Sequence, residues 1–381
     1  MPAEGERVLV CALSGRAIAQ SARAAGMAPV VLDGFADTDT AEAAAACERV
    51  ALDAGWQLDA AALLDAAARL APPPIPLIWG SGLERRPGLL ARLAAGRELL
   101  GSPPETVTRV KDPSMLAAAL RQLGLPHPET RLDPPAEPEG WLRKRAGGAG
   151  GTHIRPARGD DAAEPGWYFQ RRVMGEPVSA LVLGNGSDAL VLGFSEQWPA
   201  SGRAEAPYRF GGAAVPARLP SGLACELGAA VLRVARAFGL RGLASVDVLV
   251  SANGGWHLLE INPRPGAALD AYEAAFGVSL IGRHVAACRS GALAPLPSPR
   301  GAAASIIVYG RARRMTIPPG MAWPDWALDR TPEGRTVHAG EPLCTVTGSG
   351  ADAGAAKLVA EARCGEILER VERRMPAGAP G

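Results

Sequence analysis

Short apolar runs alternate with helical segments along the first part of the chain. The stretch RVLVCALSGRAIAQSARAAGMAPVVLD predicts a strand, a short Ser-Gly loop, a helix and a second strand, and a similar unit begins at IPLIWGSGLERRPGLLARLAA. Strands that alternate with helices predict a parallel α/β sheet, here over residues 1–105. The loops Ser14-Gly15 and Gly80–Gly82 would lie at the carboxyl ends of its strands, where open α/β sheets bind ligands.

The middle of the chain has a more β-rich pattern. It opens with one helix, which has Asp112 as N-cap, Pro113 at its first position and Gly124 just past its end. After a Pro-rich linker at 133–138, the strand WLRKRAGGAGGTHIRPA is interrupted by four glycines within five residues. Short strands separated by Gly turns follow. LACELGAAVLRVARAFGL then predicts an amphipathic helix, and GLASVDVLVSANGGWHLLEINPR predicts a hairpin.

A Pro-rich joint near 294–299 precedes the last segment, which is predicted to be small and β-rich with one final helix. Its strands are expected at 304–309 and near 341–347, with an Arg-rich turn at Arg311–Arg314 between them. The predicted division of the chain is an N-terminal α/β domain, a central domain with a glycine loop near 144–152, and a C-terminal β/α segment that packs on the central core: 1–105, 106–295 and 296–381.

Composition narrows the class of protein. The chain has 381 residues, 48% of them hydrophobic, and a formal net charge of +1, so nothing favours a nucleic-acid or membrane partner. The six cysteines are scattered without a C-x-x-C pair, which is typical of reduced thiols in a cytoplasmic protein. An export signal and an apolar run long enough to span a membrane are both lacking from the sequence.

The predicted hairpin carries an unusual row of polar residues. In a regular strand Glu260, Asn262 and Arg264 share one face, together with Trp256 and Leu258. The partner strand contains a second acid, whose position depends on the turn. A two-residue turn at Asn253-Gly254 pairs Asp247 with Glu260, whereas a turn at Gly254-Gly255 pairs Leu249 with Glu260 and makes Asp247 its diagonal neighbour. In both cases two carboxylates share one face.

Two opposed carboxylates destabilise a sheet by roughly 0.2–1 kcal/mol unless something neutralises them. Oxygen ligands of this kind suit Mg²⁺, so Asp247, Glu260 and Asn262 are candidate metal ligands. Arg264 could bind a phosphoryl oxygen or a substrate carboxylate in bidentate fashion. The alternative is a polar strand rim that water solvates.

The lysines point to a phosphate site. Only three of the 40 basic residues are lysines, and two of them, Lys111 and Lys144, lie beside the capped helix and the glycine loop. A compact ammonium kept where arginine is the default suggests that its size matters. The loop does not match the usual P-loop or dinucleotide patterns, but its backbone N–H groups could still cover phosphates. A simple turn between strands is the alternative.

Taken in order, these features resemble the ATP-grasp superfamily over residues 105–290. The resemblance implies an ATP-grasp fold preceded by a pre-ATP-grasp α/β domain. It implies that Lys111 and Lys144 contact the phosphates of ATP, and that Mg²⁺, or Mn²⁺ in its place, is the metal. It also implies that Arg264, with Lys144, is catalytic near the transferred phosphoryl group. The flap is expected to be formed by Gly147, Gly148, Gly150 and Gly151.

The segment FQRRVMGEP departs from the family pattern. By analogy Gln170, Arg172 and Val173 form the hinge against adenine, where the first residue is often Glu. Glu176 is expected at the ribose, but it stands one position early, with Pro177 in its place. The sequences LSGRAIAQSARAAG and GFSEQW…YRFGG resemble the tyramine–glutamate ligase type, which is linked to methanofuran-like cofactors. Gln197 and Arg209 would then lie near a substrate.

The predicted function is ligation of a carboxylate to an amine with release of ADP and phosphate. One alternative is an NAD(P)-dependent oxidoreductase with Asp33 as its ribose acid, and another is a nucleotide-binding subunit without ligase activity. The expected partners are small molecules, namely an amino acid or amine and a carboxylate, with a homodimer as one option for assembly. Ser14, Gly15 and Arg16 are expected to hold an anionic group of a substrate at a helix start, unless they form an ordinary turn.

Overall fold

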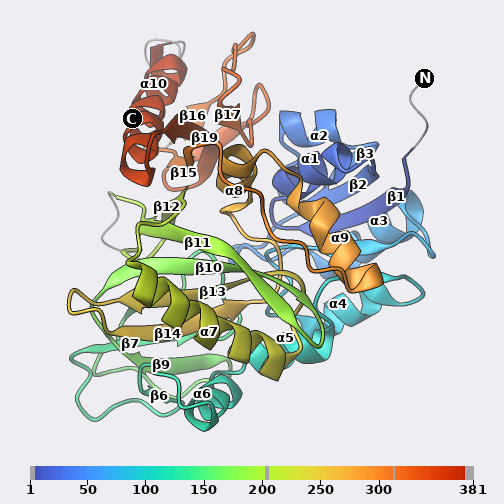
Figure 1. The fold of residues 1–381 in the computed structure, drawn as a ribbon. Coiled ribbons are helices and arrows are strands. Elements are labelled where there is room, and N and C mark those ends of the chain that lie inside the picture. The colour runs from blue at the N-terminus through green and yellow to red at the C-terminus, as the bar shows by residue number, and fades with distance from the viewer. Residues whose placement is uncertain (1–4, 202–205, 312–313, 374–381) are drawn as a thin grey trace.

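A five-stranded parallel sheet forms the N-terminal part of the computed structural model, which describes residues 5–201, 206–311 and 314–373 (Figure 1). Its order is β3-β2-β1-β4-β5. The strands are β1 (Arg7–Ala12), β2 (Ala28–Asp33), β3 (Ala46–Arg49), β4 (Leu77–Trp79) and β5 (Leu99–Leu100). The first helices are α1 (Arg16–Ala24), α2 (Thr38–Ala43), α3 (Ala60–Leu70) and α4 (Pro87–Ala94). The predicted N-terminal α/β unit is confirmed.

The strand order of this sheet reverses between β1 and β4, so the loops that follow these two strands meet. The Leu13 N–H donates to the Ser81 carbonyl at 2.6 Å. Open α/β sheets bind ligands at such a reversal, beyond the carboxyl ends of the strands. The loop after β4, residues 80–86, therefore lies where a contribution to a site is expected.

A larger antiparallel sheet of eight strands carries the middle and the end of the chain, in the order β14-β13-β10-β11-β12-β15-β19-β17. Its strands are β10 (Glu176–Asn185), β11 (Ala189–Pro199), β12 (Phe210–Val215), β13 (Arg241–Val250), β14 (Trp256–Asn262), β15 (Ala302–Tyr309), β17 (Ala327–Leu328) and β19 (Pro342–Gly350). Hydrogen bonding thus continues across the boundary expected near residue 295, because β12 pairs with β15. The division into domains stays a prediction.

Two smaller sheets complete the β-structure. A four-stranded sheet, at the lower left of Figure 1, has the order β6-β9-β7-β8, and β16 pairs with β18 near the C-terminus. These strands are β6 (Thr130–Arg131), β7 (Trp141–Arg145), β8 (Arg155–Pro156), β9 (Trp167–Arg171), β16 (Arg314–Thr316) and β18 (Thr336–His338). The strand predicted to be broken by glycines is β7 followed by β8. Part of the predicted Arg311–Arg314 turn lies outside the described residues.

The remaining helices pack on both faces of the larger sheet. They are α5 (Pro104–Lys111), α6 (Pro113–Gln122), α7 (Ser221–Phe238), α8 (Leu269–Phe276), α9 (Leu280–Ser290) and α10 (Ala353–Arg373). Asp112 caps α6 as predicted, accepting the Met115 N–H at 2.8 Å. In β10, Ala180 and Val182 pack in one core with α7, whereas Leu181 and Leu183 pack in another with α1, α8 and α9.

This alternation decides where the polar residues of the hairpin lie. Ser179 and Asp247 are paired across β10 and β13, and Ser179 is in step with Leu181. They therefore occupy the face of the sheet that is turned toward the N-terminal domain. Within the described residues, no helix is both long enough and apolar enough to cross a membrane.

Candidate functional site

Asp247 and Glu260 form one cross-strand pair of β13 and β14. Asp247 accepts a hydrogen bond from Ser179 Oγ at 2.5 Å, and Asn262 Nδ2 donates to Asp247 Oδ2 at 2.9 Å and to Glu260 Oε1 at 3.4 Å. Asn262 therefore lies between the two carboxylates. The pairing of Asp247 with Glu260, one of the two arrangements considered for these carboxylates, is observed.

The turn of this hairpin differs from the expected two-residue turn. The strands end at Val250 and Trp256, and a bulge shifts the register between Asp247 and Val248, so that Val248 pairs with Leu258. The extra residue on β14 reverses the alternation. Trp256 and Leu258 consequently pack in the core with α7, on the face opposite Glu260, which corrects the prediction that they share a face.

Lys111, the last residue of α5, reaches the end of β14. Its Nζ donates to Asn262 Oδ1 at 2.7 Å and lies 3.7 Å from Glu260 Oε2. The helix start of α6 follows directly, because Asp112 ends α5 and caps α6. The chain bend at Asp112 thus fixes the position from which the lysine extends.

Lys144 comes from another element, strand β7. Only 4% of the residue is exposed, its Nζ donates to Gln170 Oε1 at 3.0 Å, and it lies 5.7 Å from the centre of the Tyr168 ring. Pairing of β7 with β9 places Lys144 beside Tyr168, and side-chain alternation puts Gln170 on the same face. The two lysines and the carboxylate pair are therefore brought together from separate elements.

The pKa values of the two paired carboxylates, Asp247 and Glu260, are shifted in opposite directions. Burial, and then the charge of Glu260, raise the pKa of Asp247 to about 7. Burial also acts to raise the pKa of Glu260, but Lys111, Lys144 and His153 outweigh it and lower that pKa to about 2. Burial lowers the pKa of Lys144, but Tyr168 and the two carboxylates raise it further, so the lysine stays charged.

This donor set suits a divalent metal ion. Within the described residues, no three or more His, Cys, Asp or Glu side chains are grouped to hold a metal. Mg²⁺, however, commonly uses one or two carboxylates and completes its ligands with substrate phosphates. The opposed carboxylates Asp247 and Glu260 meet that requirement, and Asn262 could add an amide oxygen once its bond to Lys111 is exchanged.

The glycine flap lies between β7 and β8 and is packed at both ends. At Gly147 (φ +67°) an added Cβ would lie 3.0 Å from Arg85 Cα and 3.1 Å from the Glu84 carbonyl oxygen. At Gly151 (φ +73°) it would lie 1.8 Å from the Tyr208 carbonyl oxygen. Gly150 (φ +69°) has open space around it, and its carbonyl accepts the Phe210 N–H at 2.9 Å.

His153 lies in the flap close to Gly148, where an added Cβ would approach its ring to 2.4 Å. Burial lowers the pKa of His153 to about 4, despite the charge of Glu260, so the imidazole is neutral at pH 7. The charges of Lys111, Lys144 and Glu260 all act on it. His153 of the flap is therefore near Lys111, Lys144 and Glu260.

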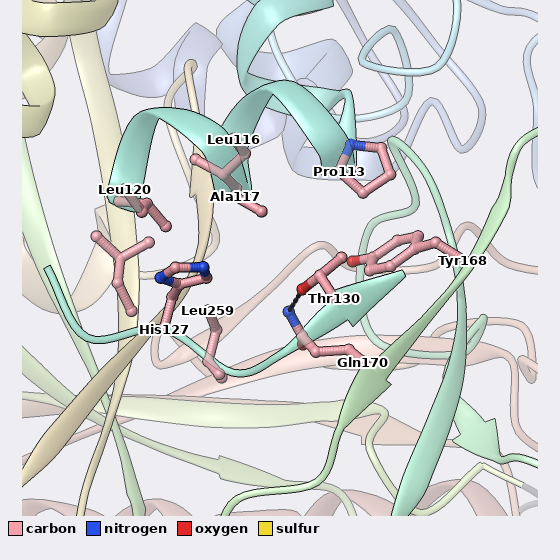
Figure 2. A pocket seen from close by; sticks show the side chains of 10 residues that line it. Pro113, Leu116, Ala117, Leu120, His127, Thr130, Tyr168, Gln170 and Leu259 are labelled. Carbon is pink, nitrogen blue, oxygen red and sulfur yellow. Dashed lines mark hydrogen bonds between the residues drawn. The ribbon is translucent and has the colours of Figure 1, made fainter. Parts of the chain in front are cut away.

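A small, mostly apolar pocket lies beside Lys144 (Figure 2). Helix α6 forms one side, Leu258 and Leu259 another, and Tyr168 and Gln170 a polar edge. Gln170 accepts from Lys144 and donates from Nε2 to Thr130 Oγ1 at 3.4 Å, which fixes the orientation of its amide.

The other expected hinge residues follow β9. Arg172 N–H donates to the Gly140 carbonyl at 2.8 Å, Val173 is half-buried, and Glu176 is exposed at the start of β10, where it pairs with Val250. Gln170, Arg172 and Val173 thus connect the small sheet with the large one. Nothing in the structure tests the ribose contact expected of Glu176.

Arg264 is held by the N-terminal domain. It is 8% exposed, and its Nε donates to Glu84 Oε1 at 2.8 Å, with Glu84 itself 2% exposed. Glu84 lies 180 residues away in the loop between β4 and α4, so no local pattern indicates the pair. Among the residues of this site, Glu84, His153, Tyr168 and Ser179 were not predicted.

Gln197 lies on β11 of the large sheet, and Arg209 directly precedes β12, where its backbone is close to Gly151 of the flap. Gln197 pairs with Ala213 and shares the face of Ser195, which itself pairs with Ser179. Arg209 is buried with its guanidinium 3.6 Å from the centre of the Tyr309 ring, and it donates to the Gly340 carbonyl at 3.0 Å. Their expected role near a substrate is untested.

The hydrogen-bond donors of Ser14, Gly15 and Arg16 are already bonded to carboxylates of this chain. Gly15 N–H donates to Asp33 Oδ2 at 2.9 Å, and Ser14 Oγ donates to Asp329 Oδ1 at 3.2 Å. Arg16 is 2% exposed and donates to Asp270 and to Asp329, with Nη2 distances of 2.7 and 2.9 Å. An anionic substrate group at this helix start does not fit such surroundings, because carboxylates already fill them.

Three sheets around this site define the ATP-grasp fold: the five-stranded parallel sheet, the four-stranded sheet that carries the flap, and the large antiparallel sheet. Residues 110–268 match the family model described as ATP-grasp domain, so the chain contains an ATP-grasp domain over that range. The predicted fold class, with its N-terminal parallel sheet and its final helix, is confirmed.

Solved structures with low sequence identity share nearly the whole fold. Biotin carboxylase from Campylobacter jejuni superposes with a TM-score of 0.73 at 16% identity, covering 93% of this chain and 89% of that one. The biotin carboxylase domain of 2-oxoglutarate carboxylase from Hydrogenobacter thermophilus, a dimer complexed with MgADP, ADP and bicarbonate, gives 0.72 at 13% identity, covering 91% and 87%.

N5-carboxyaminoimidazole synthase from Aspergillus clavatus, in complex with ADP and 5-aminoimidazole ribonucleotide, gives a TM-score of 0.68 at 15% identity, covering 97% of this chain and 99% of that one. Comparison with curated proteins gives no significant match. At these identities the similarity establishes the fold, while the reaction must be argued from the site.

Proposed function

We propose that the protein is an ATP-dependent carboxylate–amine ligase that forms an amide through an acyl phosphate and releases ADP and phosphate. The observation that carries the proposal is the convergence of one group of side chains near the glycine flap, namely Lys111, Lys144, Asp247, Glu260 and Asn262. Two lysines and two carboxylates at one site suit phosphates and a metal ion together.

In this proposal the nucleotide lies between the four-stranded sheet, β6-β9-β7-β8, and the eight-stranded sheet. Its adenine enters the apolar pocket of Figure 2 beside Gln170, and the connection through Arg172 and Val173 forms the hinge. Lys111 and Lys144 bind the phosphates, and Gly147, Gly148, Gly150 and Gly151 cover them with backbone N–H groups. Glu176 is retained as the candidate for the ribose.

Asp247, Glu260 and Asn262 would hold Mg²⁺, or Mn²⁺ in its place. When bound, the metal would neutralise negative charge on the phosphates during phosphoryl transfer. The raised pKa of Asp247 supports this role, since burial and then the charge of Glu260 both disfavour its carboxylate when no cation is bound.

The chemistry requires positioning and charge stabilisation more than a nucleophilic side chain. A carboxylate oxygen of the substrate attacks the γ-phosphorus, and the bond to the ADP oxygen breaks. The amine nitrogen then attacks the acyl carbon, the bond to phosphate breaks, and the amine loses a proton. Lys144 and Arg264 stabilise the charge that develops on the transferred phosphoryl oxygens.

The substrate pair proposed first is glutamate with an aromatic amine, because the sequence resembles the tyramine–glutamate ligase type. Gln197 and Arg209 are the residues proposed to lie near these substrates. This assignment would place the enzyme in the cytoplasm, in the biosynthesis of a methanofuran-like one-carbon cofactor. Bicarbonate is the second carboxylate to test, since two of the similar structures are biotin carboxylases.

The proposal is tested by measuring ADP release with amino acids or bicarbonate and amines supplied in pairs. We expect release that depends on both substrates and on Mg²⁺, with a hydroxamate when hydroxylamine replaces the amine. AMP and pyrophosphate as products would exclude the acyl-phosphate route. Nucleotide binding without turnover for any pair would favour a subunit without ligase activity.

A further inference from the structure

The buried ion pair between Glu84 and Arg264 connects the N-terminal domain to the end of the metal hairpin. Glu84 Oε1 accepts from Arg264 Nε at 2.8 Å, and Glu84 Oε2 accepts from the Gly82 N–H at 2.6 Å. Both carboxylate oxygens are therefore used, and the Gly82 bond fixes the carboxylate within its own loop. The loop follows β4, at the point where the order of the parallel sheet reverses.

Arg264 is fixed at two nitrogens. Besides the Nε bond to Glu84, its Nη1 donates to the Pro265 carbonyl at 3.3 Å. Within the described residues, Nη2 is the guanidinium nitrogen without such a partner. The positive charge of Arg264 also acts on Asp247, whose pKa it lowers against the larger effects of burial and of Glu260. Arg264 is thus bonded to Glu84, and its charge acts on Asp247 of the carboxylate pair.

The glycine flap packs against the same loop, residues 80–86. Gly147 packs against the Glu84 carbonyl and the Arg85 backbone so closely that a Cβ would meet both within about 3 Å. One loop of the N-terminal domain therefore contacts the flap through its backbone and Arg264 through the Glu84 side chain.

Stability alone does not explain the pair. Removing two charges from water costs several kcal/mol per ion, and the attraction between them often does no more than offset that cost. A planar guanidinium held at Nε, in contrast, has its remaining N–H groups aimed in one direction. The geometry therefore favours orientation of Arg264 as the purpose of the contact.

We propose that Glu84 is a positioning residue, which aims Arg264 so that Nη2 donates to the γ-phosphoryl group of the nucleotide. The inference rests on the proposed function, in which Mg·ATP occupies the cleft. It predicts that the N-terminal domain contributes to phosphoryl transfer without touching the nucleotide through Glu84 itself.

The test compares the affinities for Mg·ATP and Mg·ADP by isothermal titration calorimetry, since Nη2 would contact the phosphoryl group that ADP lacks. Glu84→Met keeps the volume but removes the acceptor, and it should reduce the preference for Mg·ATP by about tenfold, the effect of one charge-assisted hydrogen bond. Glu84→Gln keeps an acceptor oxygen and should restore most of the preference. Loss of stability alone would change both affinities equally.

Asp270→Asn is the matched control, because Asp270 also pairs a buried arginine of the N-terminal domain, Arg16, with the ATP-grasp core. It should lower stability and leave the preference unchanged. If Glu84→Met does not fold, Arg264→Lys, which keeps the charge without the planar fork, should lose the preference instead.

If Glu84→Met keeps the wild-type preference for Mg·ATP over Mg·ADP, the inference is overturned and the proposed function is not. The same holds for Arg264→Lys where that variant is used instead. An equal loss in Asp270→Asn would do the same, as would equal affinity of the wild type for both nucleotides. Binding of neither nucleotide by the wild type would overturn the proposed function, and the inference with it.

Discussion

Asp247 and Glu260 face each other in one cross-strand pair, yet their pKa values move in opposite directions. The lysines explain the difference, because Lys111 and Lys144 support the charge of Glu260 more than that of Asp247. In the metal-free protein the charged form of Asp247, and not that of Glu260, is therefore the disfavoured one. The pair is electrostatically incomplete until a cation joins it.

The first prediction is that Asp247→Asn stabilises the metal-free protein at pH 8 but not at pH 4. The folded-state pKa of Asp247 is raised to about 7, so the unfolded state loses its proton first, and stability is lost as the pH rises from about 4 through 7. Asparagine imitates the protonated acid and removes this loss, by an amount on the order of 1 kcal/mol. Urea unfolding with EDTA across this pH range measures it.

Asp65→Asn, a change at an exposed acid of α3, is the control and should leave the pH dependence of unfolding as in the wild type. Asp247→Asn should also lose the stabilisation that Mg·ATP gives. A variant with wild-type pH dependence would show that the carboxylate pair is not strained without metal.

The second prediction separates the size of a cation from its charge. Lys144→Arg should lower the affinity for Mg·ATP and the turnover by about tenfold or more, because a buried ammonium bonded to Gln170 leaves little room for a planar guanidinium. Lys357→Arg is the matched control, since Lys357 lies far along the chain on α10, 4.2 Å from the centre of the Trp198 ring. Equal kinetics for wild type and Lys144→Arg would refute the argument from lysine scarcity.

The sequence predicted those parts of the site that depend on local pattern. Asp112 was recognisable as a cap, and the pairing of Asp247 with Glu260 was one of the two considered, although the two-residue turn expected with it does not form. The bulge at Leu259 was not predictable, because hydrophobic alternation in "WHLLEIN" reads equally well without it. Glu84 was missed because its partner is 180 residues distant.

The prediction for Ser14, Gly15 and Arg16 failed for a related reason. A Ser-Gly-Arg turn at a helix start is a reasonable anion site when seen alone. The anions that fill it are Asp33, Asp270 and Asp329, which come from three separate parts of the chain. Only the tertiary structure shows that this chain supplies its own counter-charges.

The third prediction follows from that cluster. Arg16→Met should destabilise the protein by about 3–5 kcal/mol, because half-buried Asp270 and Asp329 lose the buried cation that they share. The folded fraction should keep the wild-type affinity for Mg·ATP, since the cluster is separate from the lysine and carboxylate site. Guanidinium unfolding and calorimetry measure the two quantities. Arg7→Met, at an exposed arginine of β1, serves as the control and should change stability little.

The fourth prediction concerns nucleotide choice. Mg·ATP at about 100 times its Kd should stabilise the protein by ~2.7 kcal/mol, whereas NAD(H) and NADP(H) should have no effect. The site favours this outcome because its lysines and carboxylates suit a metal-bound triphosphate. Thermal unfolding with each ligand measures it. A shift with a dinucleotide and none with Mg·ATP would support the oxidoreductase alternative instead.

The last prediction tests whether the flap must seat against the large sheet. Gly150 and Gly151 have nearly the same positive φ, +69° and +73°, so alanine imposes a similar backbone cost of about 1 kcal/mol at either position. Their surroundings differ, since a Cβ at Gly150 meets open space while one at Gly151 would lie 1.8 Å from the Tyr208 carbonyl oxygen. Gly151→Ala should therefore push the flap away from the sheet. It should weaken Mg·ATP binding by about tenfold or more, which corresponds to a loss of at least ~1.4 kcal/mol of binding free energy. Gly150→Ala should bind within about threefold of the wild type, because a few tenths of a kcal/mol is all that a solvent-facing methyl changes. Calorimetry on the two variants measures the difference, and equal affinities would show that closure of the flap on Tyr208 is not required for the nucleotide to bind.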